Sequence, residues 1–320
     1  MKSKILPILK LAAAICLFGG ILWYLLQKNN VSSVFQNIRL SDFFILISGI
    51  LLSYIPSGIQ MRMLLKAAQT ALSPVDTLLL PVSMSLWAYI IPANGGFLYS
   101  LYFLSKKYHC ALTNSSSVGI FTIYISFILS GICGLILAIF LPAKSALICI
   151  AGSVICIFFP FFVRTGNCIL KKLAQHFPAF TKLSNFADSI VTCCKDWLLD
   201  KKMLAANTFI VLIQLFLTYM LYVWIVLMLK LQTDLAMLFL VVIAQRISSL
   251  IRLLPGNLGI EEVVTGVLFA LTGLSWENGL LIAAILRCAQ ICILPLGIIH
   301  SMYNHIYPNS EKNSSCTKTI

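Results

Sequence analysis

Long uninterrupted apolar runs constrain this chain more than any single motif. A helix that crosses the hydrocarbon core of a bilayer needs about 20 apolar residues. Candidate spans are residues 8–26, 42–60, 115–141, 145–163, 204–229 and 279–302. Only 10% of the 320 residues are charged, against about 25% in soluble domains. The sequence therefore predicts an all-α, polytopic helical membrane protein with about six full spans.

Two further apolar regions are interrupted in the middle. Residues 77–105 contain Pro92-Ala93-Asn94-Gly95-Gly96, and residues 235–274 contain Pro255-Gly256-Asn257-Leu258-Gly259. Broken backbone at membrane depth is tolerated only where protein buries it or where it lines a polar cavity. Each region is predicted to form two half-helices folded into a re-entrant hairpin, within one transmembrane domain over residues 1–308.

The basic residues predict the orientation of the chain, because Lys and Arg gather in cytoplasmic segments. With the N- and C-termini in the cytoplasm and both hairpins returning to their side of entry, sixteen basic residues lie inside and four outside. Three more, Arg246, Arg252 and Arg287, lie within the membrane. A multi-pass protein of the cell membrane is expected. The hairpins then enter from opposite sides, which favours an inverted repeat, although Pro and Gly could also recur by chance.

The polar segment at residues 164–203 carries apolar residues at helical spacing, surrounded by lysines. This pattern is typical of a helix on the cytoplasmic membrane surface, and a helix packed under the bundle fits it equally well. Residues 309–320 are predicted to be a disordered polar tail.

Candidate site residues cluster at the two breaks. Asn94 and Asn257 stand where half-helices begin, and Asn is a good N-cap. Two helix N-termini that meet near the midplane would attract a phosphate or carboxylate. Gly96, Gly256 and Gly259 stand in the same two breaks and are counted among the candidate residues of the lipid headgroup site. The alternative is that each Asn only caps its own helix.

The arginines of the apolar regions are the strongest functional candidates, because ionisable residues in a membrane are costly. The guanidinium fork of Arg246, Arg252 or Arg287 suits phosphate. Glu261 and Glu262 are the nearby acids, so a structural Arg–Glu pair is the competing interpretation. Gln214, Gln245 and Gln290 could line the same cavity or bond between helices.

Several classes of function find no support in the sequence. Ser, His and Asp form no hydrolase pattern, the four histidines and eleven cysteines show no metal spacing, and phosphate-binding loops and dinucleotide fingerprints are missing. No catalytic residue, metal or cofactor is therefore predicted. The net charge of +13 is attributed to topology and to anionic lipid, and nucleic acid is not expected as a partner.

Residues 255–262 (Pro-Gly-Asn-Leu-Gly-Ile-Glu-Glu), followed by Gly273, Arg287 and Gly297, resemble the C-terminal signature of the lysylphosphatidylglycerol synthase transmembrane (flippase-like) family. Within that signature, Glu262 matches the family acid and Arg287 the family arginine, while Asn257 replaces a glycine. The stretch from Pro92 to Lys107 resembles the first motif of the family. There Gly96 matches, but Phe97 stands in place of the acid and Ser100 in place of an arginine.

The resemblance implies a membrane domain that binds or moves an anionic phospholipid or a polyprenyl-phosphate-linked lipid. In two-domain members a soluble domain transfers lysine to lipid, and that domain is not expected here, because only a short polar tail follows Pro308. A non-enzymatic, translocase-like protein is therefore predicted. The alternative is a membrane subunit or partner of a lipid-linked glycosyl- or aminoacyl-transferase. The oligomeric state is left open.

Overall fold

The computed structural model of the chain describes most of its apolar regions. The described residues are 16–21, 23–25, 27, 39–91, 94–177, 180–231, 233, 235–248, 255–271 and 275–306. Parts of the earlier predictions fall outside them: the beginning of the 8–26 span, the break residues Pro92 and Ala93, residues 249–254 and 272–274 of the second interrupted region with Arg252 and Gly273, and the tail 309–320.

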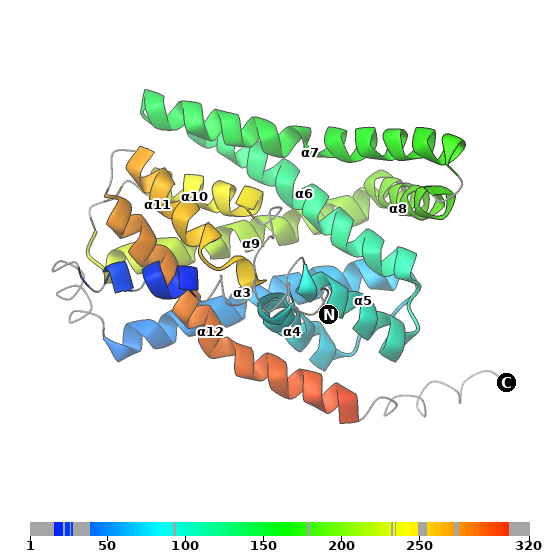
Figure 1. The fold of residues 1–320 in the computed structure, drawn as a ribbon, viewed down its shortest axis with the longest axis horizontal. Helices are drawn as coiled ribbons and strands as arrows, with labels where there is room; N and C mark the ends of the chain where they lie inside the picture. The colour runs from blue at the N-terminus through cyan, green and yellow to red at the C-terminus, as the bar shows by residue number, and fades with distance from the viewer. Residues whose placement is uncertain are drawn as a thin grey trace.

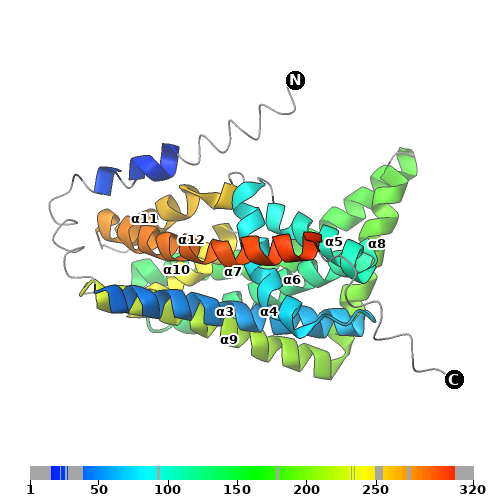
Figure 2. The same ribbon diagram turned by 90° about the horizontal axis from the view of Figure 1, so that it is seen from below.

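Every regular element in the described part of the chain is helical, as the apolar periodicity predicted. The elements are α3 (Leu40–Ala67), α4 (Pro74–Ile90), α5 (Gly95–Tyr108), α6 (Leu112–Ala138), α7 (Ala143–His176), α8 (Thr181–Leu199), α9 (Lys201–Met228), α10 (Leu235–Ser248), the 3-10 turn η2 (Pro255–Asn257), α11 (Ile260–Leu271) and α12 (Trp276–Ile306). Figures 1 and 2 show them as one bundle.

Four helices are long and apolar enough to cross a membrane, and they correspond to predicted spans. They are Leu40–Ala67, Leu112–Ala138, Lys201–Met228 and Trp276–Asn304. A fifth is possible if α7 counts as one span, although its parts Ala143–Phe159 and Arg164–His176 meet at 41°. The sequence has a proline at position 160, which lacks the N–H that a straight helix needs. The chain is thus a multi-pass helical membrane protein.

Both interrupted regions form pairs of short helices, as the Pro-Gly breaks predicted. In the first pair, α4 and α5 have 17 and 14 residues, or about 25 and 21 Å at 1.5 Å per residue, shorter than the hydrocarbon core of about 30 Å. Ser73 caps α4 by accepting a hydrogen bond from the backbone N–H of Asp76 at 3.1 Å. The two helices pack closely, because a Cβ on Gly96 would lie 2.2 Å from the carbonyl oxygen of Met84.

The segment predicted as a surface helix contains the end of α7 and all of α8. In both views α8 runs across the direction of the long helices, at one end of the molecule (Figures 1 and 2). Its buried residues face the bundle: the Trp197 ring meets Phe121 of α6 edge-on, with 5.4 Å between centroids, and Ile190 is buried. Packing against the bundle is therefore observed, whereas contact with the membrane surface stays a prediction.

Buried amides join the two long neighbours α3 and α9 (Figure 2). Gln214 on α9 donates to Oε1 of Gln60 on α3 at 3.0 Å, and Gln60 donates to Oδ1 of Asn207 at 3.2 Å. Buried polar groups need such partners in lipid, where no water can replace them. Gln214 thus takes the interhelical role that was one of its two interpretations.

Candidate functional site

The second break is built from residues with left-handed backbone. Gly256, Asn257 and Gly259 have φ of 60°, 56° and 86°, a region that glycine enters without steric cost. The chain turns there and enters α11 at Ile260. The N–H of Gly259 donates to Oε2 of Glu262 at 2.7 Å, so the N-terminus of α11 already holds a carboxylate, which its dipole favours.

Arg287 on α12 gathers the polar groups of the break. Its Nε donates to Oε1 of Glu262 at 3.0 Å, and one terminal nitrogen donates to Oε2 of Glu261 at 2.5 Å. The other terminal nitrogen donates to the hydroxyl of Tyr89 at 2.7 Å and to Oε1 of Gln290 at 3.2 Å. The guanidinium therefore has anionic or polar partners on all of its edges.

The two carboxylates differ in their access to the surroundings. The side chain of Glu262 is 1% exposed, and that of Glu261 is 20% exposed. Glu262 is held from two sides, by Arg287 and by the backbone of the break, whereas Glu261 is additionally contacted by Nδ2 of Asn257 at 3.5 Å. Glu262 is thus the anchored acid of the pair, and Glu261 is the accessible one.

Tyr89 connects this cluster to the first helix pair. It lies in the last turn of α4, and its ring fills the space where Gly256 lacks a side chain, since a Cβ there would lie 2.4 Å from Cδ1 of the ring. Arg287 lies over the same ring, with 5.6 Å from its Cζ to the ring centroid. The second break therefore packs on the end of α4 that leads into the first break.

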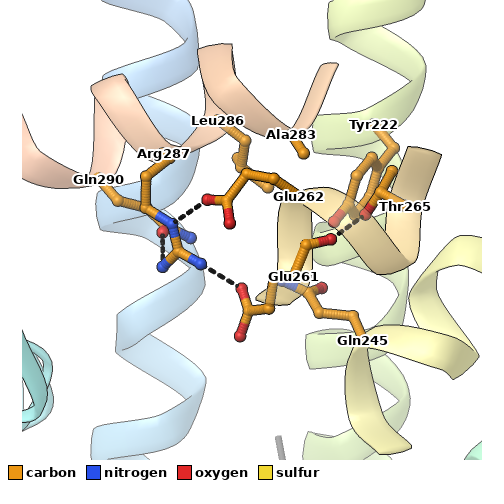
Figure 3. Close-up of a pocket in the computed structure, with 9 residues that line it drawn as sticks. All are labelled: Tyr222, Gln245, Glu261, Glu262, Thr265, Ala283, Leu286, Arg287 and Gln290. Atoms are coloured by element: carbon orange, nitrogen blue, oxygen red, sulfur yellow. Dashed lines mark hydrogen bonds and ion pairs between the residues drawn. The ribbon is translucent and has the colours of Figure 1, made fainter. Parts of the chain in front are cut away.

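A small cavity adjoins the cluster, with about 220 Å³ of empty space including its opening. Figure 3 shows the acidic groups of Glu261 and Glu262 directed toward Arg287 across it. The lining residues are Tyr222, Gln245, Glu261, Glu262, Thr265, Ala283, Leu286, Arg287 and Gln290. Gln245 and Gln290 thus line the cavity, as one of their two interpretations predicted.

Among the residues that the structure describes, the charges near the cavity balance. Tyr222 lies within electrostatic range of Glu261, Glu262, Arg287 and Arg246. Arg246 stands in the last turn of α10. Two arginines therefore accompany two glutamates. Such balance is expected where ionisable groups are held away from water.

The asparagine predictions need correction. Asn94 stands at the N-cap of α5, but with a φ of 69° its side chain makes no capping hydrogen bond. The left-handed backbone turns the chain instead, a role that Asn tolerates better than most residues. Asn257 also has left-handed backbone, and its amide reaches Glu261 rather than an N–H of α11. Gly96 packs on the α4 backbone, so its contribution is close helix packing.

Tyr89, Tyr222 and Thr265 were not predicted from the sequence. Thr265 donates to the backbone oxygen of Glu261 at 2.8 Å. A tyrosine in an apolar helix gives little signal, because aromatic residues are common there. The position of Tyr89 just before Pro92 was the available indication, since a buried tyrosine hydroxyl needs a polar partner.

Comparisons with known proteins agree with the pattern at the second break. No curated protein and no solved structure matches the chain. The family profile described as the lysylphosphatidylglycerol synthase transmembrane region matches residues 8–297, which include both breaks and Arg287. The chain therefore belongs to the lysylphosphatidylglycerol synthase transmembrane-region family.

Proposed function

We propose that this protein is a translocase-like carrier for a lipid with an anionic headgroup, either a phospholipid or a polyprenyl-phosphate-linked lipid. It would act in the cell membrane, with both termini in the cytoplasm. The observation that carries the proposal is the unequal pair of acids on Arg287. Glu262 fixes the guanidinium from its buried side, and Glu261 covers an edge that borders the cavity.

A phosphate headgroup would compete with Glu261 for Arg287. A carboxylate is planar and a phosphate is tetrahedral, and each can accept two parallel N–H hydrogen bonds from a guanidinium. Glu262 would stay in place and keep Arg287 oriented while Glu261 swings away. Tyr89 and Gln290, which already accept from Arg287, would add polar contacts to the headgroup. Exchange of one carboxylate for a phosphate leaves the guanidinium paired throughout.

In this proposal the structure corresponds to a closed state, with Glu261 seated on Arg287. The space beside Arg287 is too small for a headgroup, because the empty volume of about 220 Å³ includes open solvent at the mouth of the cavity. Movement of the Glu261 side chain away from Arg287 would enlarge the cavity at its opening. The packing of Tyr89 on Gly256 would carry such a movement to the end of α4, because interfaces of this kind rearrange as units.

Lipid scrambling in proteoliposomes tests the proposal. Fluorescent anionic and zwitterionic lipids would be compared for wild type, Arg287→Ala and Glu261→Gln. Arg62→Ala is the matched control, since Arg62 is an exposed arginine on α3. We expect wild type and the control to move the anionic lipid, and Arg287→Ala to lose movement while still inserted. Normal movement in an inserted Arg287→Ala protein would refute the site.

A second candidate function is that of a membrane partner for a lipid-linked glycosyl- or aminoacyl-transferase. The complete pairing of Arg287 favours it, because a saturated guanidinium can serve structure alone. Exposed apolar residues toward the end of α7, among them Ile169 and Leu173, would then offer a contact surface. Wild-type protein that moves none of the lipids, yet copurifies with such an enzyme, would favour this function over the first.

A further inference from the structure

A second buried polar cluster lies thirteen residues beyond Arg287 on α12, about 20 Å along the helix axis. Its centre is His300, which is 2% exposed. Nε2 of His300 lies 2.8 Å from Oδ1 of Asp76, and Nδ1 lies 2.7 Å from Oγ of Ser83. Both partners are on α4, so the histidine ties the last helix to the first half of the first broken pair.

Asp76 is shared between His300 and a group of donors from α5. Its other oxygen, Oδ2, accepts from Nζ of Lys107 at 2.7 Å and from the hydroxyl of Tyr108. Lys107 also donates to Oδ1 of Asn304 on α12 at 2.8 Å. One lysine and one aspartate balance each other, so the cluster is neutral when the imidazole is neutral.

The hydrogen bonds around His300 suit two states of the ring. In the neutral ring, the hydrogen on Nε2 points at the carboxylate, and Nδ1 accepts from the hydroxyl of Ser83. In the charged ring, Nδ1 donates to Oγ of Ser83, whose hydrogen then turns to the carbonyl oxygen of Gly297 at 3.4 Å. The polar atoms of the His300 ring and the Ser83 hydroxyl therefore keep a partner in both states without movement of these two side chains.

We propose that the Ser83–His300–Asp76 chain is a proton-binding site, and that its occupancy controls the contact between α5 and α12. Histidine is the side chain that ordinarily changes charge between about pH 5 and pH 8. The proton comes from water and is held on the ring at Nδ1. The site itself stands apart from the proposed function, while its coupling to lipid movement rests on that function.

A charged His300 would replace Lys107 as the counter-charge of Asp76. Two cations on one buried carboxylate leave an excess charge, which is costly away from water. The side chain of Lys107 is 15% exposed, and a lysine can carry its ammonium into water on a flexible stem. Its departure would remove the two hydrogen bonds of Lys107, to Asp76 and to Asn304, while Tyr108 keeps its hydrogen bond to Asp76. Protonation would thereby break the hydrogen bond between Lys107 of α5 and Asn304 of α12 and loosen the contact between the two helices.

The surroundings of His300 fit a proton better than a larger ligand. Ser83 is fully buried, so a substrate cannot reach its hydroxyl, although serine, histidine and aspartate are hydrogen-bonded in series. In the described part of the chain, the titratable groups that face the site are Asp76 on α4 and Lys107, Tyr99 and Tyr108 on α5. Phe103 contributes an apolar ring, 5.6 Å between centroids.

Nuclear magnetic resonance of ¹⁵N-labelled histidine in lipid nanodiscs tests the site directly. The protein has four histidines, and His300→Gln identifies the signal. His109→Gln is the control, because His109 is exposed at the end of α5. Between about pH 8.5 and pH 4.5, we expect the His300 signal to change from the ring protonated at Nε2 alone to the doubly protonated ring. A signal that keeps one protonation state over this range would overturn the proposal.

Two further measurements keep the test decisive. If His300→Gln does not fold, Ser83→Ala identifies the same signal, because it removes the partner of Nδ1 and shifts that resonance alone. The scrambling assay at several pH values then tests the coupling. We expect the wild-type rate to depend on pH and His300→Gln to lose that dependence. Titration of His300 with pH-independent lipid movement would overturn the coupling, and a wild type that moves no lipid would refute the proposed function without affecting the proton site.

Discussion

The two broken helix pairs differ in how they stabilise an interrupted backbone. In the first pair the break carries no charged residue in the sequence, and Gly95 and Gly96 lie directly on carbonyl oxygens of α4. Its charges stand at the far ends of the helices, at Asp76 and Lys107. In the second pair the charges stand at the break itself, where Glu261 and Glu262 meet Arg287.

In the first pair the break is held by backbone packing, and in the second pair the break is held by ion pairs. Backbone packing through glycine has few alternative arrangements, since interiors are close-packed. Ion pairs can exchange partners, because a competing charge substitutes for the original one. α12 contacts both pairs, through Arg287 at one and His300 at the other. It is therefore the helix through which a change at one pair would reach the other.

The largest effect is expected from Arg287→Gln, which removes the cation of the second break. Glu262 would be left buried and unpaired, and breaking a buried ion pair typically costs about 3–5 kcal/mol. Thermal unfolding in detergent should show a clearly lower Tm. The double variant Arg287→Gln with Glu262→Gln is the control, and it should recover much of the loss. Equal stability of the single variant and wild type would mean that the break does not depend on this charge.

The next effect is expected from Gly96→Ala at the first break. The added Cβ would lie 2.2 Å from the carbonyl oxygen of Met84, and backbone cannot move aside as a side-chain tip can. Overpacking of this kind costs about 1–3 kcal/mol. Gly166→Ala is the control, because nothing lies within 4 Å of a Cβ there, and it should unfold at or above the wild-type temperature. A tolerated Gly96→Ala would show that the first break is not fixed by packing.

Smaller and unequal effects are expected from the two acids. Glu262→Gln should destabilise the protein by about 2 kcal/mol, because two charge-assisted hydrogen bonds lose their charged acceptor. Glu261→Gln should cost less than Glu262→Gln, since the side chain of Glu261 is 20% exposed and that of Glu262 is 1% exposed. If a headgroup competes with Glu261, that variant should also bind anionic lipid more tightly. Equal losses of stability in both variants would remove the distinction between anchored and exchangeable acid.

Much of the fold could be predicted from the sequence, because lipid imposes one simple rule on helix length and polarity. The long apolar runs correspond to α3, α6, α9 and α12, and the Pro-Gly breaks fall where the helices stop. The pairing of Arg287 with Glu262 was one of two interpretations. The inverted repeat and the re-entrant path remain predictions.

The sequence could not identify the contacts that join distant segments. Tyr89 reaches Arg287 across 198 positions, and Asp76 reaches His300 across 224. Neither pair has a local spacing pattern, so no periodicity points to it. Asn94 stands at the start of α5 as predicted, but its missing capping hydrogen bond could not be predicted for a related reason. N-cap preference is a local statistic, while the close packing of α5 on α4 decides the backbone there.

The smallest effect is expected at an exposed pair far from both breaks, Lys171 on α7 and Asp188 on α8, with 2.8 Å between Nζ and Oδ1. Hydrogen bonding to Lys171 lowers the pKa of Asp188 below its ordinary 3.8, and bonding to Asp188 raises the pKa of Lys171 above 10.5. Because the pKa of Asp188 is lowered, its charge stabilises the contact fully above the ordinary value of 3.8, and this stabilisation is lost as the pH falls through the lowered pKa. Because the pKa of Lys171 is raised, its charge stabilises the contact fully below 10.5, and this stabilisation is lost as the pH rises through the raised pKa.

The α7–α8 contact should therefore hold between about pH 4 and pH 10 and loosen outside that window. Distances between spin labels on the two helices would report it, with Asp188→Asn as a control that lacks the acid transition. The response to salt distinguishes the Lys171–Asp188 pair from the ion pairs at the second break. At 1 M salt the Debye length is about 3 Å, so the exposed pair should lose its pH response. The Arg287–Glu262 pair is enclosed by protein, so the stability that it confers should hardly change, and a strong salt dependence there would mean that water reaches the break.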